Sequence, residues 1–393
     1  MFPVVPLEKN RPGGTLPWLT LNWCAMRVTP RSGRTYGEAL LFTGWFLPGH
    51  RTHPGPSDGP DNTASGGKMS TLLDSPLRPT PVQLVEDGPD PDLHQQTVPR
   101  RLVHRASVSE VLITGWRRVG ADRFLVGAQW PRGHSFYAPV EEVHDPLIVA
   151  ETLRQAALLL SHVAYEIPLD HAFLMQDMSF QVDPGKLGVG AGPTDVTIGI
   201  TGRDIRRRRS VVSAMRYDFA FYRGHEHVGG GGGAFESVSP QAYARLRGDA
   251  FERHVMSAPL QYDGRLGHRV RDSVLAPTAT RYRWVIEADR RHPVLFDHPV
   301  DHLPGMVLVE AMRQAAKVVT GRRLDGPFGL DVSFAKYAEL DRPVFVQATP
   351  GQPRENGDRV VRVEVEQDGE TVAQGVLDIR ALPGAAEPRG QER

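Results

Sequence analysis

Apolar residues dominate two stretches of the chain, at 144–167 and at 304–321. In both, they cover nearly every side of a 3.6-residue period, which predicts a helix buried on all faces rather than lying on a surface. Asp145 fits the N-cap of the first helix, Pro146 fits its first helical position, and Gly321 ends the second helix. Other elements must therefore surround both helices.

Shorter segments, rich in β-branched and aromatic residues and separated by glycine or charged breaks, lie on both sides of each helix. Strands are predicted at 107–118 and 122–131 before the first helix, and between 173 and 239 after it. The second half repeats this order, with strands between 273 and 289 and again between 328 and 379, where Asp368-Gly369 predicts a hairpin turn. Each half is therefore an α+β unit.

The two helices share more than their apolar character. ETLRQAALLL starts at Glu151 and EAMRQAAKVV starts at Glu310, an offset of 310 − 151 = 159 residues. The segments DMSF and DVSF, which follow the helices, begin at Asp177 and Asp331, an offset of 331 − 177 = 154 residues. Two similar offsets in the same order indicate an internal duplication. Two such units can pair their sheets into a pseudo-dimer.

Charge and cysteine content narrow the class of protein. The 46 Lys and Arg residues balance the 46 Asp and Glu residues, so no global field favours nucleic acid or a membrane surface. The single cysteine, Cys24, excludes an internal disulfide and a cysteine-based zinc site, and it fits a reducing compartment. The chain has neither an apolar run of roughly 18 residues nor a signal-peptide pattern. We expect a cytoplasmic protein that binds no nucleic acid, membrane or metal.

The first 95 residues differ from the rest. Residues 1–95 are rich in proline and glycine, and we expect them to be disordered because they bury too little apolar surface. Met69 begins a segment that resembles a natural start, so the residues before it are either a flexible tail or not translated. We expect a first repeat at 98–250, a second at 260–382 and a flexible tail at 383–393.

Several motifs in this order resemble a known family. The matching segments are VHRASVSEVLITGW (103–116), HSFYAP (134–139), DPLIVAETLRQAA (145–157), FLMQDMSF (173–180), YARLRG (243–248) and DHPVDHLPGMVLVEAMRQAA (297–316). They are similar to the A-factor biosynthesis (AfsA) family, the γ-butyrolactone synthases built as two hotdog repeats. The resemblance implies a tandem double hotdog fold, in which an antiparallel sheet wraps a long central helix twice.

The same resemblance implies an activity. The family is implicated in transferring a β-ketoacyl group from acyl carrier protein to the hydroxyl of dihydroxyacetone phosphate. The products are precursors of γ-butyrolactone, furan or butenolide signals, and the step needs no cofactor. A hotdog dehydratase or thioesterase and a non-catalytic acyl-binding regulator remain alternatives. The sequence leaves open the acyl chain length, the repeat that carries the reaction and the oligomeric state.

The duplicated helix motif supplies candidate site residues. Each copy places an Arg three residues and a Gln four residues after its Glu, on one helix face: Glu151, Arg154 and Gln155, and Glu310, Arg313 and Gln314. The Glu–Arg pair either fastens the helix to its neighbours or belongs to a reactive site, since buried charge is costly unless it is paired or used.

The attack of a hydroxyl on a thioester needs a base, a site for the oxyanion and a site for the acceptor phosphate. We assign Glu310 as the base, the amides of Gly305 and Met306 as the oxyanion site, and Arg313 as the phosphate clamp. Gln314 is assigned to substrate binding. The same roles for Glu151, Arg154 and Gln155 of the first copy are equally open.

Histidines and basic residues complete the candidates. His298 and His302 are helpers in substrate binding, and the prolines near them argue against a helical metal pair. The related dehydratases carry a His nine residues before the equivalent of Gly305, where this chain has Phe296; this counts against dehydration. The run Arg206, Arg207, Arg208 and Arg209 is either a solvated loop or a dock for acidic acyl carrier protein. GGGGG at 229–233 lacks the features of a phosphate loop and indicates a kinked or flexible strand.

Overall fold

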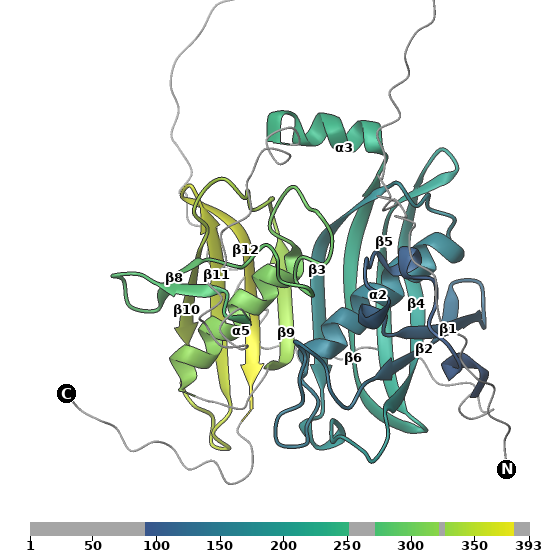
Figure 1. Ribbon diagram of the computed structural model, residues 1–393, viewed down its shortest axis with the longest axis horizontal. Coiled ribbons are helices and arrows are strands. Elements are labelled where there is room, and N and C mark those ends of the chain that lie inside the picture. Colours follow the sequence, from purple (N-terminus) through teal and green to yellow (C-terminus); the bar gives the residue numbers. More distant parts are fainter. Residues whose placement is uncertain (1–90, 251–271, 322–326, 381–393) are drawn as a thin grey trace, which may run out of the picture. The chain divides into compact units, whose positions relative to one another are not determined.

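A computed structural model of the chain describes residues 91–250, 272–321 and 327–380. Its strands join into one antiparallel sheet of twelve strands within this described part (Figure 1). The strands are β1 (Ile113–Arg118), β2 (Arg123–Trp130), β3 (Ala172–Val182), β4 (Thr194–Arg208), β5 (Val211–Arg223), β6 (Glu226–Val238), β7 (Leu275–Pro277), β8 (Arg283–Ile286), β9 (Pro327–Phe334), β10 (Phe345–Pro350), β11 (Arg359–Gln367) and β12 (Glu370–Ile379).

The order of strands across the sheet shows the duplication directly. It runs β1-β2-β4-β5-β6-β3 through the first half and β9-β12-β11-β10-β8-β7 through the second, so each half mirrors the other about the centre. At the centre β3 and β9 pair antiparallel, with Met178 opposite Val332. This pairing makes one continuous sheet of the two halves, and the predicted tandem double hotdog fold is confirmed.

Two long helices, α2 (Leu147–Val163) and α5 (Gly305–Thr320), pack against the same face of this sheet. Figure 1 shows α2 over the strands of the first half and α5 over those of the second. Most residues of both helices are buried, as their nearly continuous apolar sequence requires. The shorter helices are α3 (Pro240–Arg247), which follows β6, and the 3₁₀ turns η1 (Pro91–His94), η2 (Arg100–Val103), η3 (Val108–Glu110) and η4 (Pro184–Lys186).

The first described residues correct one expectation. Residues 91–95 were predicted to be disordered, but η1 packs on the sheet and its Leu93 is buried. Two glycines make room for it: a Cβ at Gly115 would lie 2.9 Å from the Leu93 carbonyl oxygen, and one at Gly127 would lie 2.3 Å from the same atom. Residues 1–90 and the predicted tail at 383–393 lie outside the described residues.

The glycine run has a different explanation from the expected one. It lies inside β6, between β3 and β5, and is paired on both sides. A Cβ at Gly229 or Gly231 would lie 2.3 or 2.2 Å from a carbonyl oxygen of β3. Close approach of the neighbouring backbone therefore requires glycine here. The predicted hairpin turn is confirmed, with Asp368 and Gly369 at φ 54° and 78° between β11 and β12.

Candidate active site

The Gln of the duplicated motif makes equivalent hydrogen bonds in both halves. In the first half, Gln155 donates from Nε2 to the carbonyl oxygen of Glu110 at 2.7 Å, and its Oε1 accepts from the N–H of Leu112 at 2.9 Å. Gln314 makes the equivalent pair of bonds, at 2.8 and 3.0 Å, to the backbone that leads into β7. Each Gln thus fixes its helix to the segment before the first strand of its half, and these bonds leave neither amide for a substrate.

The two motif carboxylates are equally buried, with Glu151 and Glu310 each 1% exposed. Each accepts two hydrogen bonds from the Arg three residues later, at 2.8–3.0 Å in the first half and at 2.8 Å in the second. Each also accepts one from its own Gln, at 2.7 and 2.6 Å. Both copies of the motif thus supply the same hydrogen bonds to a buried carboxylate, which is costly to bury without partners.

In the second copy, an additional carboxylate, that of Asp145, binds the motif arginine. Nη1 of Arg313 donates to Oδ2 of Asp145 at 2.7 Å, and the other oxygen of Asp145 accepts from the N–H of Leu147 at 2.9 Å. Asp145 therefore caps α2 and pairs with the Arg of α5 at the same time. Burial would lower the pKa of Arg313, but Asp145 and Glu310 outweigh it and raise the pKa above its usual value.

The first copy is arranged differently. Glu151 has a second cation, Arg105, whose Nη2 lies 2.7 Å from its Oε1. Burial alone would raise the pKa of Glu151, but Arg105 and Arg154 together hold this pKa at about 2. Arg154 uses Nε and Nη2 for Glu151, whereas its Nη1 has no hydrogen-bond partner among the described residues. The side chain of Arg154 is 20% exposed, and it reaches a cavity.

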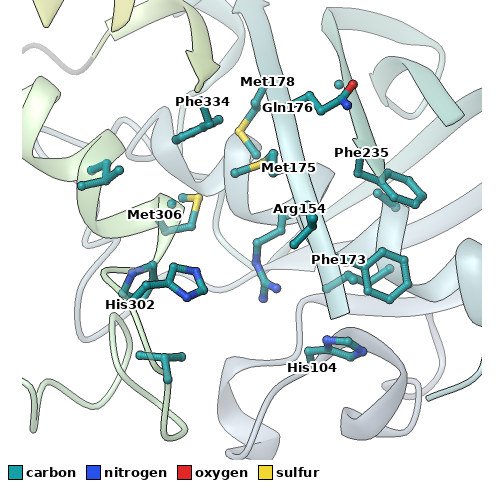
Figure 2. A pocket seen from close by; sticks show the side chains of 18 of the residues that line it. His104, Arg154, Phe173, Met175, Gln176, Met178, Phe235, His302, Met306 and Phe334 are labelled. Carbon is teal, nitrogen blue, oxygen red and sulfur yellow. The ribbon is translucent and has the colours of Figure 1, made fainter. Parts of the chain in front are cut away.

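This cavity has a volume of about 700 Å³ and lies where the two halves meet. Its size is in the range of small-molecule sites. Figure 2 shows the Arg154 side chain extending into it between His302 and His104. Much of the apolar lining comes from α2, from strands β3, β5, β6 and β9, and from α5, including Leu153, Ala157, Leu158, Phe173, Met175, Met178, Phe219, Phe235, Met306, Leu308 and Phe334. The polar groups that face it include His104, Arg105, Arg154, Asp297, His298 and His302.

The N-terminus of α5 opens into the cavity. Gly305 and Met306 both line it, and within the described part of the chain their N–H groups have no acceptor. The next two N–H groups, of Val307 and Leu308, bond to the carbonyl oxygen of Pro304. The free amides and the helix dipole favour negative charge at this point. In α2 the equivalent place is taken by Asp145.

Two Asp–His pairs lie next to this helix end. His302 donates from Nδ1 to Asp301 at 2.7 Å, and His298 makes the same contact with Asp297 at 2.6 Å. A carboxylate on Nδ1 fixes the tautomer in which Nε2 is free to accept a proton. Burial would raise the pKa of Asp301, but bonds from His302, Arg247 and other donors hold it below its usual range. Asp301 therefore remains an anion that orients His302.

These contacts change the roles assigned from the sequence. Arg154, Gly305, Met306, His298 and His302 all line the cavity. The motif residues Glu151, Gln155, Glu310, Arg313 and Gln314 are not among its lining residues, because each is consumed by the buried bonds described above. These bonds do not support the base role predicted for Glu310 or the clamp role predicted for Arg313, although burial raises the pKa of Glu310.

Four polar residues at the cavity or beside it were missed from the sequence: His104, Arg105, Asp297 and Asp301. His104 and Arg105 belong to the segment VHRASVSEVLITGW, and the two aspartates each precede one of the predicted histidines. All four fall in segments that carry the family resemblance, which was the available signal. Among the described residues, no group of three His, Cys, Asp or Glu side chains is placed to hold a metal ion.

The arginine run is placed at the tip of a hairpin. Arg206, Arg207 and Arg208 end β4, and Arg209 lies in the turn to β5 with φ 58°. All four side chains are exposed. None of them is among the residues that line the cavity.

No helix in the described part is long and apolar enough to span a bilayer.

Comparisons with known proteins identify the family of the chain. The family described as the A-factor biosynthesis hotdog domain matches residues 87–238 and 268–383. A 2-oxo-3-(phosphooxy)propyl 3-oxoalkanoate synthase of Streptomyces virginiae is 45% identical over 74% of this chain and 99% of its own. The synthase of that name from Streptomyces griseus is 39% identical over 70% of this chain and 93% of its own. Among solved structures, the 12:0-ACP thioesterase from Umbellularia californica shares 11% identity over 65% of this chain and 94% of its own, with a TM-score of 0.41.

Proposed function

Because the chain belongs to the A-factor biosynthesis hotdog family, we propose that it is an acyltransferase that moves a β-ketoacyl group from acyl carrier protein to the hydroxyl of dihydroxyacetone phosphate. The product is a phosphorylated 3-oxoalkanoate ester, the kind of compound named in the similar synthases. Such an ester is a precursor of γ-butyrolactone-type signals.

One observation carries the proposal, namely the different partners of the two motif arginines. Nη1 of Arg313 holds the carboxylate of Asp145, which also caps the N-terminus of α2. Nη1 of Arg154 has no such partner in the described residues and faces the cavity, together with the uncapped N-terminus of α5. By the duplication, an anionic ligand in the cavity takes the place on Nη1 of Arg154 that the Asp145 carboxylate takes on Nη1 of Arg313. A phosphate monoester fits that place because a guanidinium binds its oxygens with charge-assisted bonds.

The remaining groups support an acyl transfer. With the thioester carbonyl at Gly305 and Met306, their N–H groups face the oxyanion that develops during attack. His302, oriented by Asp301, takes the proton of the acceptor hydroxyl on Nε2 as the hydroxyl oxygen bonds to the carbonyl carbon. The carbon–sulfur bond then breaks, and the thiolate of the carrier leaves with that proton. The apolar lining from α2, β3 and β6 suits the acyl chain.

The direct test uses the purified chain with a β-ketoacyl pantetheine thioester and dihydroxyacetone phosphate, followed by mass spectrometry. We expect an ester that retains the phosphate. His302→Gln should lower the rate roughly 10²–10⁴-fold, the usual contribution of a general base. His225→Gln, an exposed residue in the β5–β6 turn, is the matched control and should leave the rate unchanged. Thioester hydrolysis at the same rate with and without the phosphorylated acceptor would instead indicate a thioesterase.

The carrier protein is expected to dock on the exposed arginine hairpin. Replacing Arg206–Arg209 by serine should lower kcat/KM for an acyl carrier protein substrate by about tenfold at low salt, and the loss should shrink as salt is added. A small pantetheine thioester should be used almost equally well by both proteins, since it lacks the acidic carrier. An equal fall in kcat/KM for both substrates would indicate that the hairpin is a solvated loop and not a docking site.

A further inference from the structure

Next to Arg154 the cavity is bordered by His104, which is hydrogen-bonded to His162. Nε2 of His104 lies 2.9 Å from Nε2 of His162, and Nδ1 of His162 lies 2.7 Å from the carbonyl oxygen of Ile167. Both rings pack edge-on against Phe173 of β3. His104 ends η2 in the left-handed region, at φ 51°, and lines the cavity. A non-glycine residue held in this region is found most often where structure or function demands it.

The two hydrogen bonds settle which nitrogens carry protons. A carbonyl oxygen only accepts, so Nδ1 of His162 carries a hydrogen and, in the neutral ring, Nε2 of His162 is an acceptor. Nε2 of His104 must then be the donor between the two rings. The remaining nitrogen, Nδ1 of neutral His104, carries no hydrogen and has no partner among the described residues. His104 therefore presents an acceptor, not a donor.

The surroundings keep His104 neutral in the free protein. Burial, followed by the electrostatic effects of His162, Arg154 and His298, lowers the pKa of His104 to about 3. His162 and Arg154 belong to α2 and His298 precedes α5, while β3 contributes only the ring of Phe173. Arg154, His298 and His104 all line the cavity, and His298 is paired with Asp297. A neutral acceptor cannot hydrogen-bond to an anion, which is also an acceptor, unless a proton arrives with it.

We propose that the acceptor phosphate binds between Arg154 and His104, and that one proton from solvent enters with it, bridging Nδ1 of His104 and a phosphate oxygen. This inference rests on the proposed function, since it concerns the acceptor of that reaction. At pH 7.5 a free phosphate monoester is mostly a dianion, because its second pKa is about 6. Neither the dianion nor neutral His104 carries the bridging hydrogen, so the solvent supplies it.

His162 is then a positioning residue that acts through His104. By accepting from Nε2 of His104, it prevents the neutral tautomer with hydrogen on Nδ1. Without this acceptor, His104 could turn to that tautomer and donate to the phosphate with no proton taken up. The pair therefore ties phosphate binding to pH. Above pH 7, Kd for the phosphorylated acceptor should rise about tenfold per pH unit, because the complex holds one more proton than its free components.

The test is calorimetry of dihydroxyacetone phosphate binding to the full chain at pH 7.5, in two buffers with different ionisation enthalpies. The difference in heat gives the number of protons taken up, and about one is expected. His104→Gln should bind more weakly and take up none, because the Gln amide donates directly to the dianion. His162→Phe should bind, but with an uptake well below one proton. Melting curves of both variants show that the fold persists.

Outcomes against the inference are separate from those against the proposed function. Binding of dihydroxyacetone phosphate with no proton uptake in the wild-type chain overturns the bridging proton and leaves the transfer reaction standing. An uptake that stays at about one in His104→Gln assigns the proton elsewhere and also overturns it. If the wild-type chain forms the phosphorylated ester in no assay and does not bind the acceptor, the proposed function and this inference both fall.

Discussion

Replacing Arg154 by alanine is expected to lower kcat/KM for dihydroxyacetone phosphate by roughly ten- to a hundredfold or somewhat more. This corresponds to the loss of a charge-assisted contact worth about 1.5–3 kcal/mol. The kcat/KM for dihydroxyacetone without phosphate should fall much less, because this acceptor has no phosphate for the guanidinium to bind. The fold should persist, since Glu151 keeps Arg105 as a buried cationic partner. Rates with both acceptors, measured on one preparation, give the result.

Arg154→Lys is the informative companion. It restores a charge but not the fork that holds Glu151 through Nε and Nη2 and offers Nη1 to the cavity. Partial recovery with the phosphorylated acceptor, and no change with the other, would support a phosphate contact. If Arg154→Ala lowers kcat/KM equally for both acceptors, the side chain shapes the cavity rather than binding phosphate.

Replacing Arg313 by alanine should have a different and mainly structural effect. Glu310 and Asp145 would both lose the cation that they share inside the protein, and breaking a buried pair in this way costs about 3–5 kcal/mol of unfolding free energy. For a domain of this size the melting temperature should fall by roughly 6–20 °C. Residual activity should keep its preference for the phosphorylated acceptor. Arg342→Ala, which removes an exposed arginine with acidic partners, is the control and should cost at most about 1 kcal/mol.

The pH dependence of this variant gives a second check. Burial already raises the pKa of Glu310 in the wild-type chain, and without the cation this pKa should rise further, so the folded variant binds more protons than its unfolded state over a wider pH range. Stability should then increase more in the variant than in the wild-type chain as pH falls from 7 towards 5. If the variant melts like the wild type but loses its preference for the phosphorylated acceptor, Arg313 binds the phosphate, as the sequence predicted.

The sequence predicted the fold well because its main signals are local or repeated. Two helices without a polar face require a sheet around them, and the offsets from Glu151 to Glu310 and from Asp177 to Asp331 reveal the duplication without any structure. The local error at residues 91–95 arose because composition says nothing about two glycines, Gly115 and Gly127, that make room for Leu93.

The candidate site was only half predictable, for a physical reason. Both copies of the motif are the same in sequence, and what distinguishes them comes from far along the chain. Arg313 is hydrogen-bonded to Asp145, 168 residues away along the chain, while Glu151 is hydrogen-bonded to Arg105, 46 residues away. No spacing rule connects such pairs. The histidines were easier, because His298 and His302 each follow the aspartate that orients them and lie just before α5.

The continuous sheet through β3 and β9 has a consequence for how the two halves could diverge. In a homodimer of identical units, one gene encodes both interfaces, so an aspartate that closes one cleft closes the other as well. Covalent fusion removes this constraint, because a substitution then changes one cleft at a time. Asp145 could therefore become a fixed internal anion in one half while Arg154 stayed open to a ligand in the other. A single-chain design also keeps the open cleft assembled at any concentration, since its two walls cannot dissociate.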